Sequence, residues 1–231
     1  MAVSAVRPVR GVLLCALALP ILGLLAACGS GRSGGAGDPP TPSRSPSATC
    51  VAPSCQLRQT VRLAGGDEVR LWLTTDQQDY RSRPVVELLV DGQPGQSWVS
   101  PQGDGWNGTL TCLNGSAGAT PNCVLVDSAG MHASVAELLL VRDGRLVHPA
   151  GAEASADSPG LRAADLDHDG YLDVIGTTND YSPNYAQGHN YWQTFRYADG
   201  RFVLTGCARQ AGTPAPTRLL SGACPPSGRA A

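Results

Sequence analysis

Residues Glu137 to Gly151 read ELLLVRDGRLVHPAG, and residues Gln193 to Cys207 read QTFRYADGRFVLTGC. In each stretch a run with strand character ends at Asp-Gly, and a second run follows directly. Asp-Gly between two such runs is the strongest short-range signal for a β-hairpin, because both turn residues must adopt a positive φ. A third Asp-Gly, Asp91-Gly92, ends the run PVVELLV. The sequence therefore predicts antiparallel hairpins.

The three Asp-Gly turns also indicate an internal repeat. Asp143 and Asp199 lie 56 positions apart, and Asp91 lies 52 positions before Asp143. Periods of this size are typical of β repeats that stack as blades. The alternative is three ordinary hairpins that share favoured turn residues. The remaining apolar runs are short and bounded by turn residues, so they too predict strands.

The N-terminus predicts an export signal over residues 1–27. Arg7 and Arg10 precede an apolar run, Gly11 to Ala27, that is short for a membrane span. The run ends in Leu-Ala-Ala-Cys at Cys28, which resembles a bacterial lipobox. We therefore expect a lipoprotein that is lipidated at Cys28 and anchored on the outer face of the cell membrane. An ordinary secretory signal and an uncleaved anchor are the alternatives.

The rest of the chain divides by composition. Residues 28–48 are rich in Gly, Ser and Pro and predict a flexible tether. Residues 49–207 predict one all-β domain, and residues 208–231 a Pro/Gly/Ala-rich tail. The formal net charge of −2 gives no electrostatic argument for a nucleic-acid partner.

Six cysteines follow Cys28, and an even number in an exported chain predicts disulfides. One pair flanks a Gly/Asn/Pro-rich loop between two apolar runs, where a disulfide would staple a hairpin, and the other two pairs follow by elimination. A zinc site would need ligand spacings that the cysteines lack. The predicted pairs are Cys112–Cys123, Cys50–Cys55 and Cys207–Cys224.

The stretch ADLDHDGYLDVIG, Ala164 to Gly176, places four carboxylates at short spacing around a glycine. Ca²⁺ takes about six to eight oxygen ligands. Gly170 lets the backbone turn sharply, so that a carbonyl can face the ion while the last acid closes the loop. The predicted Ca²⁺ ligands are the side chains of Asp165, Asp167, Asp169 and Asp173 and the carbonyl of Tyr171.

The loop is not an EF-hand. Counted from Asp165, position 12 is Gly176, where an EF-hand needs a bidentate acid. The residues Tyr171 to Thr178 are rich in β-branched side chains and predict a strand, whereas an EF-hand needs a helix there. What remains is a short DxDxDGxxD loop between two strands.

This loop, its following strand and the next Asp-Gly hairpin together resemble the FG-GAP and VCBS repeats of integrin-like β-propellers. The resemblance covers roughly Pro159 to Val203. It implies a Ca²⁺ loop with the same ligands, with His168 pointing away from the ion, on a blade-like sheet. Only one such loop is intact, and a closed propeller takes at least about four blades of roughly 40 residues. We therefore expect an all-β, disulfide-stapled fold resembling a partial or minimal β-propeller; a β-sandwich that carries the loop is the alternative.

The segment Asn179 to Trp192 holds a large share of the aromatic residues. Exposed aromatic side chains favour binding surfaces. The alternative is that the last two begin the next strand and pack in the core. The candidate ligand surface is Tyr181, Tyr185, Tyr191 and Trp192.

Catalytic motifs are missing from the sequence: there is no GxSxG elbow and no HExxH, and the four histidines lie apart. We expect a non-catalytic, surface-tethered module with a structural Ca²⁺ site, which contacts another protein or a cell-wall glycan. The alternative is a secreted carbohydrate-binding accessory protein or hydrolase that uses residues 179–192.

Overall fold

The computed structural model describes residues 55–74, 83–104, 107–115, 119–130, 133–157 and 160–225. They belong to one compact unit, Arg44–Ala231. All their regular secondary structure is β, which confirms the predicted all-β class. Within these ranges no helix is long and apolar enough to cross a membrane. The predicted signal, the lipidated Cys28 and the tether lie outside the described residues.

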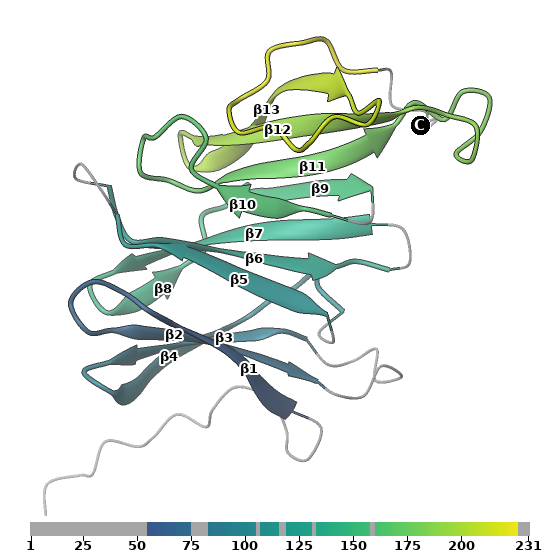
Figure 1. Ribbon diagram of the computed structural model, residues 1–231. Helices are drawn as coiled ribbons and strands as arrows, with labels where there is room; N and C mark the ends of the chain where they lie inside the picture. Colours follow the sequence, from purple (N-terminus) through teal and green to yellow (C-terminus); the bar gives the residue numbers. More distant parts are fainter. Residues whose placement is uncertain are drawn as a thin grey trace, which may run out of the picture. The chain divides into compact units, whose positions relative to one another are not determined.

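In the described ranges, thirteen strands form three antiparallel sheets (Figure 1). The first sheet contains, in spatial order, β1 (Cys55–Arg62), β2 (Glu68–Thr74), β3 (Val85–Val90) and β4 (Gln93–Val99). The middle sheet contains β5 (Gly108–Leu113), β6 (Asn122–Ser128), β7 (Ala133–Arg142), β8 (Arg145–Val147) and β9 (Glu153–Asp157). The third sheet contains β10 (Arg162–Ala164), β11 (Asp173–Asn179), β12 (Asn190–Ala198) and β13 (Arg201–Arg209).

Each sheet contains one of the predicted Asp-Gly hairpins. The turns join β3 to β4, β7 to β8 and β12 to β13. At all three turns both the Asp and the Gly have positive φ, as a type I′ turn requires. The φ values are 51° and 74° at Asp91-Gly92, 50° and 68° at Asp143-Gly144, and 52° and 82° at Asp199-Gly200. The local chemistry of two residues therefore fixes one hairpin in every sheet.

The middle sheet is buried on both faces. Leu71 of the first sheet shares a hydrophobic cluster with Leu139 of β7. The neighbouring residue Leu138 belongs to a second cluster with Val174 of β11 in the third sheet and Leu172, which directly precedes that strand. Alternate side chains of a strand point to opposite faces, so β7 supplies both clusters. This explains why its sequence is almost continuously apolar.

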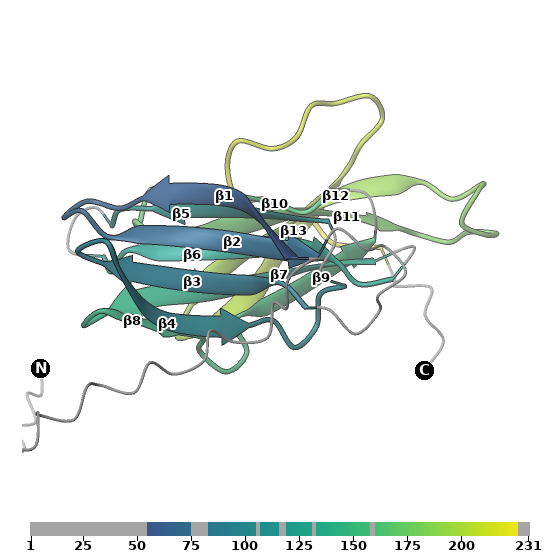
Figure 2. The same cartoon turned by 90° about the horizontal axis from the view of Figure 1, so that it is seen from below.

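The sheets remain separate in their pairing. Among the described strands no hydrogen-bonded pairing joins one sheet to another or closes a barrel. Figure 2 looks onto the first sheet, whose strands lie in front of those of the other two sheets. The coarse prediction, antiparallel β-sheets stapled by disulfides, is confirmed.

Two predicted disulfides are present. Cys112–Cys123 joins directly opposed residues of β5 and β6. Cys207–Cys224 joins β13 to the segment that follows it, and the Cys207 amide donates to the carbonyl of Gly222 at 2.9 Å. The residues between Arg209 and Cys224 therefore return to the third sheet. Cys55 is disulfide-bonded, and its predicted partner, Cys50, lies outside the described residues.

Candidate metal centre

The Asp loop joins β10 to β11, so it lies between two strands as its sequence predicts. Gly170 has a φ of 90° and His168 a φ of 62°, so the backbone turns through the left-handed region twice. The His168 side chain is exposed, as the resemblance implies. The loop therefore curls inward on its acidic side chains.

Three of the four predicted carboxylates come together. Asp165, Asp167 and Asp173 each offer one oxygen, and these atoms all lie within 4.8 Å of one another. Backbone amides hold two of them: the Gly170 amide donates to Asp165 Oδ2 at 3.2 Å, and the Asp169 amide donates to Asp167 Oδ1 at 3.3 Å. Such side-chain-to-backbone bonds are what Asp contributes to turns. The three groups together can hold a metal ion.

Asp173 is the anchor of the loop. It is fully buried, and its two oxygens accept the amides of Leu166 at 3.0 Å and Tyr197 at 3.1 Å. Burial raises the pKa of the Asp173 carboxyl to about 6, which these two hydrogen bonds only partly oppose; the charges of Asp167 and Asp169 raise it further. A carboxylate has about four lone-pair sites, so both oxygens can still accept a cation.

Asp165 provides the clearest indication of a missing partner. Its Oδ1 is buried and has no hydrogen-bond partner. A buried carboxylate oxygen without a partner costs free energy that a donor or a cation would recover. A donor set made only of oxygens suits a hard cation such as Ca²⁺. The residues present therefore fit the predicted ion.

The carboxylate of Asp169 is not part of the three-residue group. It accepts the Tyr171 amide at 2.9 Å and pairs with Arg196 Nη2 at 3.2 Å. Arg196, on β12, also places its Nε 2.8 Å from Asp167 Oδ2. A guanidinium thus neutralises part of the loop from a neighbouring strand, a feature that sequence spacing did not reveal.

A buried asparagine attaches the loop to the middle sheet. Asn122, the first residue of β6, donates through Nδ2 to the Gly170 carbonyl at 2.9 Å. Its Oδ1 accepts the Leu172 amide at 2.9 Å. Sequence reasoning missed Asn122 because nothing local marks an asparagine far upstream as a partner of this loop.

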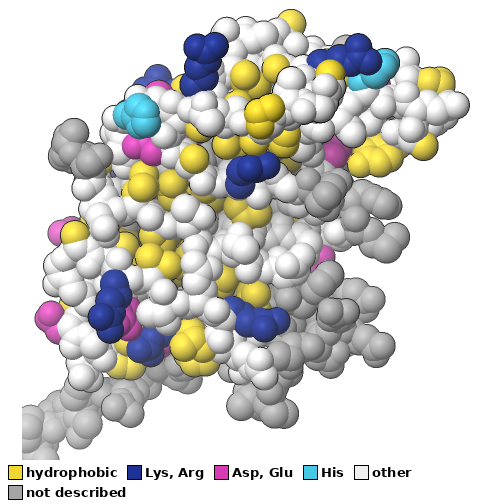
Figure 3. Space-filling view, in the orientation of Figure 1, with side chains coloured by type: hydrophobic (Ala, Val, Ile, Leu, Met, Phe, Trp, Pro, Cys, Tyr) yellow, Lys and Arg dark blue, Asp and Glu magenta, His cyan; other side chains and the backbone are white. Residues whose placement is uncertain are grey.

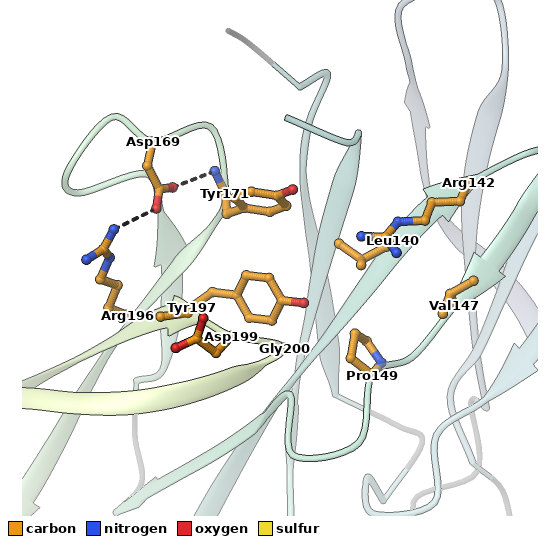
Figure 4. Close-up of a pocket in the computed structure, with 11 residues that line it drawn as sticks. Leu140, Arg142, Val147, Pro149, Asp169, Tyr171, Arg196, Tyr197, Asp199 and Gly200 are labelled. Atoms are coloured by element: carbon orange, nitrogen blue, oxygen red, sulfur yellow. Dashed lines mark hydrogen bonds and ion pairs between the residues drawn. The ribbon is translucent and has the colours of Figure 1, made fainter. Parts of the chain in front are cut away.

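A groove of about 510 Å³ lies beside the loop (Figure 4). Tyr171 and Tyr197 line one side with ring centroids 5.3 Å apart, and Leu140 and Arg142 line the other. Both tyrosine hydroxyls point toward Leu140 and Arg142 in Figure 4. Burial raises the pKa of Tyr197, so its hydroxyl stays protonated. The groove thus combines aromatic rings with neutral and cationic donors.

The predicted aromatic surface divides into two pairs. Tyr191 and Trp192 begin β12 and are partly buried; the Trp192 indole donates to the Thr213 carbonyl at 3.2 Å. Tyr181 and Tyr185 lie in the preceding loop with ring centroids 5.4 Å apart. The strand expected in the alternative is therefore present, but neither residue belongs to the hydrophobic clusters. A ligand role for these residues stays a prediction.

The face shown in Figure 3 carries Arg side chains spread over the surface rather than gathered into one stripe. Comparisons of the chain with models of known protein families, with curated proteins and with solved structures found no match. The functional argument therefore depends on the geometry of the loop, the groove and the sheets.

Proposed function

We propose that this chain is a calcium-binding, non-catalytic module in which the Asp loop holds a structural Ca²⁺ ion. The observation that carries the proposal is the buried, unpartnered Oδ1 of Asp165 beside the oxygens of Asp167 and Asp173. A divalent cation would offset the mutual repulsion of these groups and would supply the partner that Asp165 lacks.

The contacts of the loop support a structural role for the ion. Asp173 contacts β12 through the Tyr197 amide, and Asn122 ties the loop to the middle sheet. An ion that fixes the loop would therefore fix the junction of two sheets. Sites in extracellular modules can have a Kd of roughly 10⁻⁴ to 10⁻³ M. At ten times Kd such an ion stabilises the fold by about 1.4 kcal/mol.

We propose that the module is exported and tethered through a lipid on Cys28. The disulfides Cys112–Cys123 and Cys207–Cys224 support an oxidising compartment, where Ca²⁺ is also plentiful. The Asp-Gly hairpin that recurs in each sheet supports a blade-like repeat of the FG-GAP and VCBS kind. In this setting the partner is another protein or a cell-wall glycan.

A second candidate function is carbohydrate binding. It is favoured by the groove beside the loop, because Tyr171 and Tyr197 offer ring faces while Arg142 and Arg196 offer donors. The exposed Tyr185 supports a sugar-binding role for residues 179–192 in the same way. A glycan array probed with the full chain, with and without Ca²⁺, tests this candidate.

Thermal unfolding of the full chain tests the calcium proposal. We expect Ca²⁺ to raise the melting temperature above that in excess chelator, and Asp165→Asn to remove the difference. Asp143→Asn is the matched control, because Asp143 is an exposed turn residue outside the loop and Asn tolerates its positive φ. Identical melting curves of the unmodified chain in Ca²⁺ and in chelator would refute the proposal.

A further inference from the structure

A second cluster of potential ligands lies in the middle sheet. Glu137 of β7, His148 after β8 and Glu153 at the start of β9 each offer one ligand atom, all within 4.8 Å of one another. None of these residues belongs to the Asp loop, and no sequence motif joins them. The strand pairing brings them together.

The gap between β8 and β9 determines which ring nitrogen of His148 carries the hydrogen. β8 and β9 both pair with β7, β8 opposite residues 140–142 and β9 opposite residues 133–137. Leu138 lies opposite the interruption, and His148 Nδ1 is 2.9 Å from its carbonyl oxygen. A carbonyl can only accept, so Nδ1 must carry the hydrogen. The lone pair of the neutral ring is then on Nε2.

His148 Nε2 faces a carboxylate. It lies 3.2 Å from Glu153 Oε1. With the hydrogen on Nδ1, two lone pairs would meet at this distance unless a second proton or a cation lies between them. A histidine that donates one ring N–H to a backbone carbonyl is also the usual arrangement of a metal-ligating histidine.

Glu137 adds a buried negative charge to the same place. It is fully buried and directly opposite Glu153 in the register of β7 and β9. Ser100 Oγ donates to its Oε2, and its Oε1 has no hydrogen-bond partner. Like charges directly opposite in a sheet destabilise it, and a buried carboxylate oxygen without a hydrogen-bond partner adds to the cost.

We propose that Glu137, His148 and Glu153 bind a divalent transition-metal cation of the Zn²⁺ class. One imidazole nitrogen with two carboxylates suits such an ion, whereas Ca²⁺ and Mg²⁺ prefer oxygen donors alone. Two donors about 2.0–2.2 Å from a tetrahedral ion lie about 3.4 Å apart, close to the 3.2 Å between His148 Nε2 and Glu153 Oε1. The Glu153 side chain is 34% exposed, so an ion can enter from solvent.

Residues at the end of the first sheet hold the ligands. Ser100 orients Glu137, and Gln102 Nε2 donates to Glu153 Oε2 at 2.7 Å. The Trp98 ring lies 5.3 Å from the His148 ring, centroid to centroid. Such supporting contacts around a ligand set fix its geometry. The ion would therefore cross-link β7, the interrupted strand and, through these residues, the first sheet.

Isothermal titration of the metal-free full chain with Zn²⁺, in buffer that contains Ca²⁺, tests the proposal. We expect one saturable site. His148→Gln and Glu137→Gln should weaken it by more than the roughly 10–100-fold expected for loss of a supporting residue. Asp165→Asn should keep the Zn²⁺ site, which separates it from the Asp loop. His189→Gln is the matched control, because His189 is an exposed histidine already paired with an acid, Asp180.

Thermal unfolding with and without Zn²⁺ separates the effect of a variant on stability from its effect on metal binding. Metal-free Glu137→Gln should be at least as stable as the unmodified chain, because it removes a buried charge, yet Zn²⁺ should no longer raise its melting temperature. A folded unmodified chain that shows no saturable Zn²⁺ site overturns the proposal. So does His148→Gln with unchanged affinity.

Discussion

The Asp loop and the Glu137–His148–Glu153 cluster each bring carboxylates close together, but they do so by different means. The loop gathers its carboxylates from nine consecutive residues, Asp165 to Asp173, and holds them with their own backbone amides. The cluster gathers its groups from the interior of β7, from the residue after β8 and from the first residue of β9, through the pairing of β8 and β9 with β7. The loop therefore depends mainly on local turn chemistry, whereas the cluster depends on the strand pairing of the middle sheet, with Ser100 and Gln102 holding two of its ligands.

The largest expected effect comes from Asp173, where the loop itself depends on tertiary structure. Asp173→Ala leaves the amides of Leu166 and Tyr197 without an acceptor, at about 1–3 kcal/mol each. We expect the free energy of unfolding to fall by about 2–6 kcal/mol even in chelator, measured by urea unfolding. Asp167→Asn, which keeps the side-chain size at a partly exposed position, should change stability little in chelator. A loss from Asp173→Ala that appears only with Ca²⁺ would show that the residue acts as a ligand alone.

The next largest effect is expected at Ser100, which supports the cluster from the first sheet. Ser100→Ala removes the hydroxyl that donates to the buried Glu137, and we expect a loss of about 1–3 kcal/mol in urea unfolding without metal. Zn²⁺ affinity should also fall by about 10–100-fold. Ser155→Ala, at an exposed position of β9, is the control. Equal stability and affinity in both variants would show that Glu137 does not depend on Ser100.

In the metal-free protein, both regions should make the free energy of unfolding decrease as the pH rises. Burial raises the pKa of Glu137 and of Asp173 to about 6, so the folded state holds these protons more tightly than the unfolded state. The resulting stability is fully present below the unfolded pKa values near 4 and is lost as pH rises through about 6. Urea unfolding in chelator from pH 4 to pH 7.5 measures this decline. The double variant Glu137→Gln with Asp173→Asn should flatten the profile, and an unchanged slope would assign the decline to other groups.

The smallest effect is expected at Arg196, which compensates charge only in the loop. Its side chain is 44% exposed, and exposed ion pairs contribute about 0–1 kcal/mol. Arg196→Gln removes a positive charge beside Asp167 and Asp169, so the affinity for Ca²⁺ should rise by up to about fivefold. Calorimetric titration at low ionic strength measures the change, and Arg201→Gln is the exposed control. Reduced affinity in Arg196→Gln would mean that the arginine orients the ligands.

The fold was predictable where two or three adjacent residues determine the backbone conformation of a turn. The Asp-Gly turns required positive φ at both positions and formed hairpins where they stand. The strand expected from Tyr171 instead begins at Asp173. The physical reason is that the Tyr171 amide donates to Asp169 and the Leu172 amide to Asn122, so neither is available for the sheet.

The site residues were likewise predictable from the sequence only where they lie close together in the chain. Spacing alone brought Asp165, Asp167 and Asp173 together, because a tight turn leaves little freedom over nine residues. Arg196 and Asn122 reach the loop from other strands, and no pattern near the loop marks them. His148 and Glu153 gain their meaning from the interruption between β8 and β9, which only the paired sheet reveals.

The segment that follows β13 has a consequence for self-association. An edge strand offers unpaired amides to other chains, and β13 also exposes Val203 and Leu204. Here the Gly222 carbonyl already takes the Cys207 amide, and Cys207–Cys224 keeps it there. Oxidation of this cysteine pair thus holds the chain over one end of the β13 edge, so reduction should free an amide there for strand addition.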